Sequence, residues 1–131
     1  MTDAHARTEE QMKLTELIGH VDEIKPNAFT NEQKTRWVNQ LEGRIAAEVF
    51  LWNPVTMCVQ HVWPETEDDP DQELLVGPPW EQIYEHWLEA RIDYANGEYD
   101  KYENSMAMFE EAFHAFAAWF INRYHPAEHR G

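Results

Sequence analysis

The feature that most constrains the fold is a row of large apolar side chains near the C-terminus. They recur every three or four residues, which is the spacing of one face of an α-helix. The row consists of Tyr102, Met106, Phe109, Phe113, Phe116, Phe120 and Tyr124. A face of this kind is stable only when other elements cover it. The pattern therefore predicts a helical protein packed around a wide aromatic seam, and nothing in it suggests a catalytic residue.

Three further helices are predicted before this one. Leucine, isoleucine and valine recur with helical spacing from residue 14 to residue 24, before the Lys25-Pro26 stop. Thr30 can cap a second helix that runs to Asn53. On this second helix we expect four polar residues to lie largely off the apolar face: Arg36, Asn39, Glu42 and Glu48.

The third helix is predicted to follow Pro78-Pro79 and to end at Asn96-Gly97, because glycine readily takes the left-handed conformation of a helix C-terminus. Only this short turn separates it from the C-terminal helix. A connection of that length forces the two helices to lie antiparallel as a helical hairpin.

Residues 53–79 have a different pattern. Apolar and polar residues alternate at 55–60, the period of a strand, and Leu74, Leu75 and Val76 form a second short apolar run. We predict a small β-hairpin or extended arm with an acidic tip. The whole is then a mainly α, four-helix bundle-like domain over residues 13–125, with the arm at 53–79 and flexible extensions at 1–12 and 126–131.

The charge excludes several classes of function. The chain has 25 acidic and 10 basic residues, a formal net charge of −15, and six of the acids with no base lie within 53–79. Such a surface repels the phosphates of nucleic acids and of anionic lipids.

No apolar run approaches the ~20 residues that a membrane span needs. The single cysteine, Cys58, excludes an internal disulfide, so we expect a protein of a reducing cytoplasm without a membrane partner.

The spacing of some acids and histidines is compatible with a metal site. Glu111 and His114 form the Glu-x-x-His pair of di-iron bundles, and Glu81, Glu85 and Glu89 lie four residues apart on the third helix. That design needs two such pairs, and the chain has one. His114 follows Phe113, close to the apolar face, where a structural histidine is commoner. We therefore predict no catalytic residue, no metal and no cofactor.

Five stretches of the chain carry a resemblance to a known family: Leu14 to Ile18, Val21 to Asn27, Glu73 to Tyr84, Ala90 to Tyr102 and Asn104 to Phe109. They resemble small prophage proteins that are encoded near the major capsid gene and grouped with head–tail connector (adaptor) proteins. The likeness covers about residues 12–124.

This resemblance implies a helical bundle that assembles as a ring under the portal and extends the DNA channel. Its partners would be other copies of itself, the portal protein and a tail-proximal connector or stopper protein, with DNA only as passing cargo. It would be found in the host cytoplasm during assembly and at the head–tail junction of the virion. The family brings no catalytic residues.

The predicted function is therefore that of a structural virion protein. The residues expected at its interfaces are Trp63, Leu74, Leu75, Val76 and Trp80. One alternative is a small carboxylate-rich helical bundle that binds metal or acts as an enzyme. A second is an acidic binding module that mimics DNA, although its charge should then form a patterned face rather than concentrate in one arm.

Overall fold

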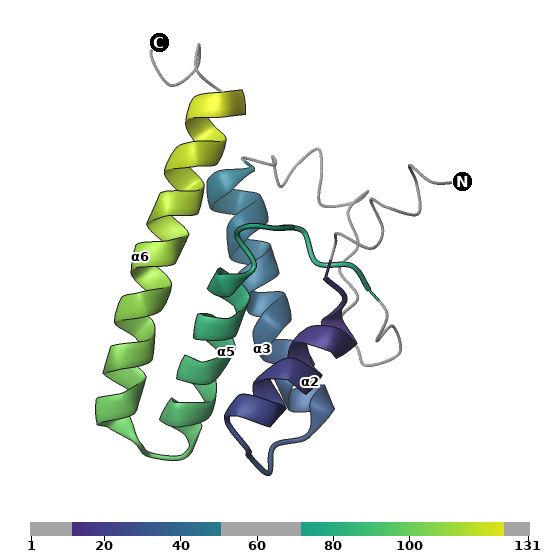
Figure 1. Ribbon diagram of the computed structural model, residues 1–131, viewed down its shortest axis with the longest axis vertical. Helices are drawn as coiled ribbons and strands as arrows, with labels where there is room; N and C mark the ends of the chain where they lie inside the picture. Colours follow the sequence, from purple (N-terminus) through teal and green to yellow (C-terminus); the bar gives the residue numbers. More distant parts are fainter. Residues whose placement is uncertain (1–11, 51–71, 125–131) are drawn as a thin grey trace.

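The computed structural model describes residues 12–50 and 72–124, and within them the protein is helical (Figure 1). The helices are α2 (Leu14–Ile24), α3 (Asn31–Arg44), α5 (Gln82–Ala95) and α6 (Tyr99–Tyr124), and the π-helical turn η1 (Ile45–Val49) continues α3. The predicted fold class is confirmed. The predicted strand at 55–60 and both terminal extensions, apart from residue 12, lie outside the described residues.

The predicted hairpin of the last two helices is confirmed as α5 and α6, which run side by side along the length of α5 (Figure 1). The turn between them is closed by two backbone hydrogen bonds: Gly97 N–H to Tyr94 O at 3.0 Å and Glu98 N–H to Asp93 O at 2.9 Å. Gly97 has a φ of 76°, the left-handed conformation that glycine adopts without strain. The sequence therefore fixes this reversal at Gly97.

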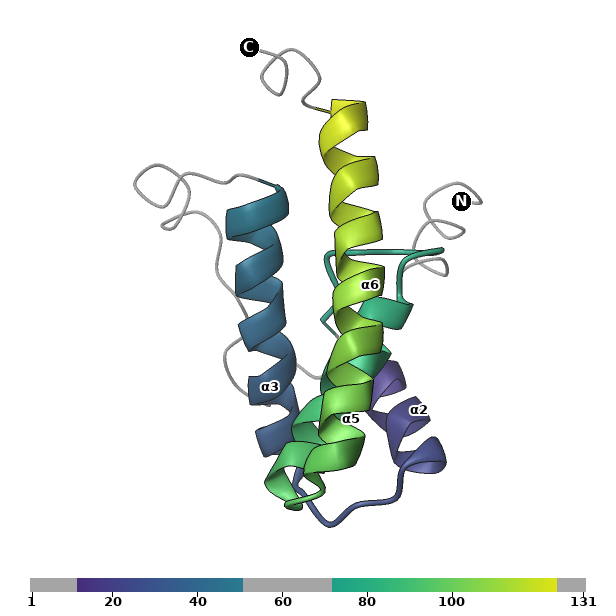
Figure 2. The ribbon, with the colours of Figure 1, turned by 90° about the vertical axis from the view of Figure 1, so that its left-hand side faces the viewer.

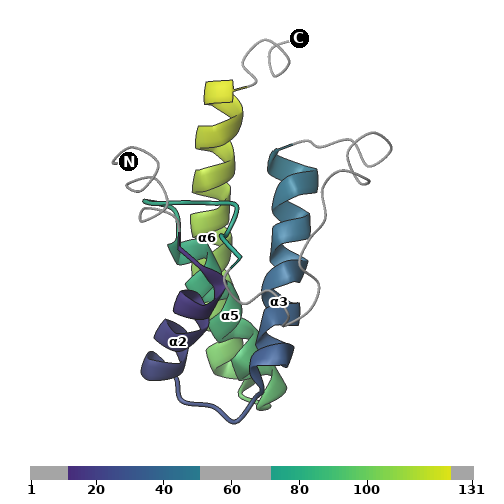
Figure 3. The ribbon, with the colours of Figure 1, turned by 90° about the vertical axis from the view of Figure 1, so that its right-hand side faces the viewer.

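Helices α2 and α3 each contact α5 and also contact each other, and Figures 2 and 3 show them on either side of α5 in the view along the α5–α6 pair. The start of α3 is capped as expected, since the Thr30 hydroxyl accepts a hydrogen bond from Gln33 N–H at 3.0 Å. Between α3 and α5, the Trp87 indole N–H donates to the backbone oxygen of Trp37 at 2.8 Å. The second of these contacts joins α3 to α5.

The core contains the apolar faces of all four helices. Its fully buried large residues include Leu17, Leu41, Ile45, Ile83, Leu88, Ile92 and Phe109. Ile24, which the pattern placed on the apolar face of the first helix, is 53% exposed at the end of α2.

Charged groups are also buried in this core, and the pattern did not predict them. The Lys34 ammonium, 2% exposed, contacts Asp22 at 2.7 Å. Asp93 contacts Lys25 at 2.9 Å and accepts a hydrogen bond from the Ser105 hydroxyl at 3.1 Å. Buried charges are tolerated when they are paired and hydrogen-bonded in this way.

Residues 72–77, here called the strap, cross the bundle beside the N-terminal end of α5 (Figure 1). The strap forms one antiparallel bridge, Lys13 with Glu73, through Leu14 N–H to Gln72 O at 2.9 Å and Leu74 N–H to Met12 O at 3.0 Å. The expectation of a strand at 74–76 is therefore corrected. The next strap amides donate to the side chains of Glu42 and Tyr84 rather than to a neighbouring strand.

The second helix also departs from the prediction of one regular helix up to residue 53. After Arg44 it widens into η1, where Phe50 N–H donates to Ile45 O at 3.0 Å, five residues back. The wider turn buries Ile45, Ala46 and Val49. It also places the Phe50 ring 4.7 Å from Phe120 of α6.

Candidate functional site: the aromatic end

Five aromatic side chains gather where α6 extends beyond α5 and faces the end of α3. We call them the aromatic end: Phe50, Trp80, Phe116, Trp119 and Phe120. The ring centroids of Trp80 lie 5.8 Å from Phe116 and 5.5 Å from Trp119. Phe120 lies 4.7 Å from Phe50 and 6.0 Å from Phe116. These separations are those of interacting aromatic pairs, so the rings form one cluster.

Helix length and spacing explain why these rings meet here. α6 has 26 residues and α5 has 14, so α6 projects about 18 Å beyond its partner at 1.5 Å per residue. The aromatic stripe continues along this projection without α5 to cover it (Figure 1). The end of α3 and Trp80, at the start of α5, cover it only in part.

The aromatic end is accessible at its rim. Trp119 is 41% exposed, and Phe50, Trp80 and Phe120 are half-buried. The rings surround a shallow depression of about 130 Å³ that Leu75, Val76 and Pro78 also line. The Trp80 indole N–H is buried and has no hydrogen-bond acceptor among the described residues. A buried donor without an acceptor is costly, and an added chain could supply one.

The structure brings three of the five predicted interface residues to this depression: Leu75, Val76 and Trp80. Leu74 and Val76, however, are only 1% and 3% exposed, because their side chains pack into the core of the chain. Leu75 and Trp80 are half-buried at the surface, and the role of all four residues at an interface stays a prediction. Trp63 lies outside the described residues.

A buried polar network attaches the strap behind the aromatic end. Glu42 accepts hydrogen bonds from the Tyr84 hydroxyl at 2.7 Å and from Leu75 N–H at 2.9 Å. Tyr84 in turn accepts from Val76 N–H at 3.0 Å. The expectation that Glu42 lies off the apolar face is wrong, since it is fully buried.

The network changes the acidity of both side chains. Burial raises the pKa of Glu42 to about 7, against the lowering effect of its hydrogen bonds from Tyr84 and Leu75. Burial, followed by the charge of Glu42, raises the pKa of Tyr84 well above its usual value. Both side chains are fully buried, and their hydrogen bonds attach the strap to α3 and α5.

The residues considered for a metal do not come together. His114 is an exposed residue whose ring nitrogen lies 3.6 Å from Glu110, so the expected position against the apolar face is corrected. Glu85 contacts His20 at 3.3 Å. Among residues 12–50 and 72–124, no three histidine, cysteine or acidic side chains form a group that could hold a metal ion.

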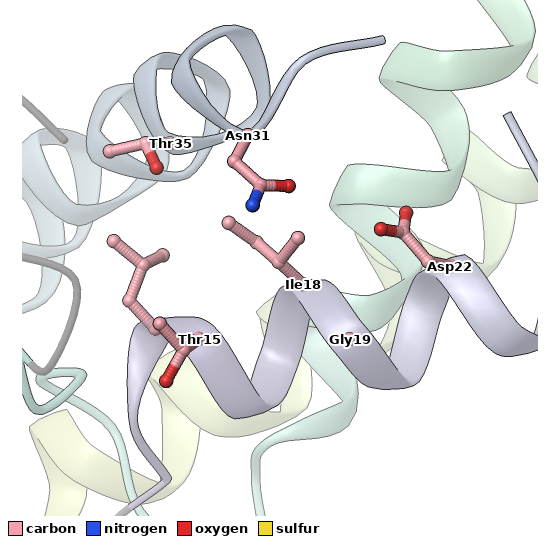
Figure 4. A pocket seen from close by; sticks show the side chains of 7 residues that line it. Thr15, Ile18, Gly19, Asp22, Asn31 and Thr35 are labelled. Atoms are coloured by element: carbon pink, nitrogen blue, oxygen red, sulfur yellow. The ribbon is translucent and has the colours of Figure 1, made fainter. Parts of the chain in front are cut away.

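A second pocket, of about 240 Å³, lies between α2 and α3 (Figure 4). Its lining includes Thr15, Ile18, Asn31 and Thr35, with Asp22 at one end. The Asp22 carboxylate already accepts hydrogen bonds from Lys34 at 2.7 Å and Asn27 at 2.9 Å. The one charged group that lines this pocket is thus already paired within the fold. The pocket is therefore a weaker candidate for a functional site than the aromatic end.

Comparison of the chain with models of protein families, with curated proteins and with solved structures found no match. Within the described part of the chain, no helix has the length and apolar character that crossing a bilayer requires.

Proposed function

We propose that this chain is a structural subunit of a head–tail connector, which assembles as a ring and buries its aromatic end against the neighbouring subunit. The observation that carries the proposal is the exposure of Trp119 within a five-ring cluster. Partly exposed aromatic clusters of this kind are typical of protein interfaces, where tryptophan and tyrosine supply most of the binding energy.

Two features of the architecture support a ring. Subunits of a ring contact one another through two different surfaces, so each offers one end and receives another. The aromatic end lies at one end of α6, and the α5–α6 turn at the other (Figure 1). The body between them has a well-packed core, so it can carry an interface without rearranging.

The charge is consistent with a subunit around a DNA channel. A net charge of −15 would repel a passing duplex and allow it to slide, in contrast to the basic surfaces that attract DNA. The proposal thus keeps DNA as cargo, with the portal protein and a tail-proximal stopper protein as the other partners.

The test is the mass of the purified chain in solution, measured by light scattering over a concentration series with and without a portal protein. We expect one discrete large oligomer, formed by the chain alone or after the portal is added. A monomer or dimer that is indifferent to the portal at every concentration would overturn the proposal.

A deletion that tests the arm must spare the strap. Leu74 and Val76 belong to the core, and Leu75 N–H donates to Glu42. Removing residues 54–78 would therefore unfold the helices as well. A deletion limited to 55–70 leaves these contacts in place and keeps the measurement of assembly interpretable.

A further inference from the structure

A second aromatic surface lies at the opposite end of α6. Tyr94 and Tyr99, on either side of the α5–α6 turn, are 50% and 57% exposed. Their rings lie 5.4 Å apart, and the ring of Tyr102 lies 5.1 Å from Tyr94. Because Gly97 fixes the turn, the tyrosines are held in place by the backbone rather than by a cover of other side chains.

Arg91, which has no acidic partner among the described residues, borders these rings. The Arg91 guanidinium carbon lies 5.5 Å from the ring centroid of Trp87 and 5.8 Å from that of Tyr94. Its Nε is buried, and no acceptor for it is found in residues 12–50 and 72–124. We call Arg91, Tyr94, Tyr99 and Tyr102 the tyrosine–arginine patch.

The lack of a carboxylate at Arg91 contrasts with the other cations near the core. Lys25, Lys34 and Arg44 each contact an aspartate or glutamate within 3.1 Å. Even the exposed Lys101, close to the same turn, contacts Glu98 at 3.6 Å. In a chain with 25 acids and 10 bases, a half-buried arginine that contacts two rings and has no carboxylate partner in residues 12–50 and 72–124 is available to an acidic group from outside this part of the fold.

We propose that the tyrosine–arginine patch binds the acidic segment 65–73 of a second copy of this chain. That segment carries six acids and no base: Glu65, Glu67, Asp68, Asp69, Asp71 and Glu73. Arginine and tyrosine are the side chains that such contacts favour, since the guanidinium pairs with carboxylates and the phenols donate hydrogen bonds. This inference rests on the proposed function and adds a second pair of surfaces to the contact that the aromatic end would make with the neighbouring copy.

The position of the patch favours a contact between copies. The parts of the fold that flank the acidic segment are the end of η1 and the start of the strap. Both lie towards the end of the bundle opposite the α5–α6 turn (Figure 1). A contact between one copy's acidic segment and the next copy's turn is head-to-tail, which is the arrangement that closes into a ring.

The experiment reverses the charge of the patch in one variant of the chain and the charge of the acidic segment in another. One variant carries Arg91→Glu, and the other carries Asp68→Lys with Asp69→Lys. Each variant alone meets a like charge at every contact, so we expect it to need about a tenfold higher concentration to assemble. In an equimolar mixture the reversed pair and the original pair alternate, and we expect assembly to return towards the wild-type concentration.

Two further variants keep the experiment decisive. Arg36→Glu, an exposed arginine on α3, is the matched control and should assemble like wild type. Tyr99→Ser tests the patch at a side chain that is 57% exposed, in case Arg91→Glu is found by circular dichroism not to fold. The proposal is supported if Arg91→Glu and the Asp68→Lys, Asp69→Lys variant each fail to assemble alone at the wild-type concentration but assemble when they are mixed.

Three results would contradict it in distinguishable ways. If folded Arg91→Glu and Tyr99→Ser assemble like wild type, the patch is not an interface, although the proposed function stands. If both charge variants fail and their mixture also fails, the contact is not one between copies. If the wild-type chain does not assemble even with the portal protein, the proposed function falls and this inference falls with it.

Discussion

Helix α6 carries two sets of aromatic rings that the sequence spacing does not distinguish. Phe109 and Phe113, in its first half, are 0% and 3% exposed, and the Arg44 guanidinium lies 4.4 Å from the ring centroid of Phe113. Trp119, in the second half, is 41% exposed. The first set faces α5 and α3 within the subunit, while the second lies beyond the end of α5.

The difference shows that periodicity predicts which face of a helix is apolar but not what covers it. Coverage depends on the lengths of the neighbouring helices. α5 is 12 residues shorter than α6, and α6 extends past the N-terminal end of α5. The rings beyond it are the ones that we assign to assembly, and the rings beside it are the ones that we assign to stability.

The largest loss of stability is expected where other helices cover the aromatic stripe of α6. Phe109→Ala removes a fully buried ring that lies 5.2 Å from Trp87 and 5.4 Å from Phe113. Its loss should lower the free energy of unfolding by about 3–5 kcal/mol, as measured by urea denaturation. The neighbouring Met108→Ala is the control: Met108 is 47% exposed, so we expect a change within about 0.5 kcal/mol. Equal losses for the two variants would mean that the core is not closed at Phe109.

The next effect concerns the buried ion pair of the same region. Lys25→Met leaves the Asp93 side chain, which is 1% exposed, with only the Ser105 hydroxyl. An unpaired buried carboxylate should lower the free energy of unfolding by about 3 kcal/mol. Lys101→Met, whose pair with Glu98 is exposed, should change it by less than about 1 kcal/mol. A Lys25→Met variant as stable as Lys101→Met would show that Asp93 is reached by solvent.

The third effect is a dependence of stability on pH, and it tests the hydrogen bonds that attach the strap to Glu42 and Tyr84. Glu42 has a pKa of about 7 in the fold against a usual value of 4.5, so the folded state binds its proton more tightly than the unfolded chain does. Its contribution to stability is therefore fully present below about pH 4.5 and is lost as the pH rises through 7. The loss is roughly 3 kcal/mol at most, since one pKa unit is about 1.4 kcal/mol.

Glu42→Gln removes this titration. Thermal unfolding of wild type should show stability falling between pH 5 and pH 8, and the variant should show a flatter profile. At pH 5 Glu42 is protonated in the fold and resembles the neutral amide, so the variant should have about the wild-type stability there and should be the more stable of the two at pH 8. Parallel profiles for the two proteins would contradict the assignment of the slope to Glu42.

The smallest effect on stability is expected at the aromatic end. Trp119→Ser removes a ring that contacts Trp80 and Phe116 but is 41% exposed. We expect the free energy of unfolding to fall by about 1 kcal/mol, well below the loss for Phe109→Ala. A loss as large as that of Phe109→Ala would place Trp119 in the core and remove the contrast between the two halves of α6.

Much of the fold could be predicted because its signals are local. Helical spacing, the Thr30 cap and Gly97 each act within a few residues, and the structure has the expected helices and hairpin. Glu42 was misplaced because its partners, Tyr84 and Leu75, lie 42 and 33 residues away. No local pattern shows that a glutamate will be buried by such partners.

The candidate site was predicted in part for the same reason. Leu75 and Trp80 were expected at an interface and lie at the aromatic end. Phe116 and Phe120 were assigned to the stripe, but their distinct role depends on where α5 ends. Phe50 was missed, because the π-helical turn that brings it beside Phe120 has no clear signal in the sequence.

The measurement that tests the central claim most directly is the mass in solution of Trp119→Ser, compared with Met108→Ser under the conditions in which wild type assembles. Both positions are exposed apolar residues of α6, so the comparison separates the aromatic end from the rest of the helix. We predict that Met108→Ser forms the wild-type oligomer and that Trp119→Ser remains a folded monomer. A Trp119→Ser variant with the wild-type mass would contradict the claim that the aromatic end is the assembly surface.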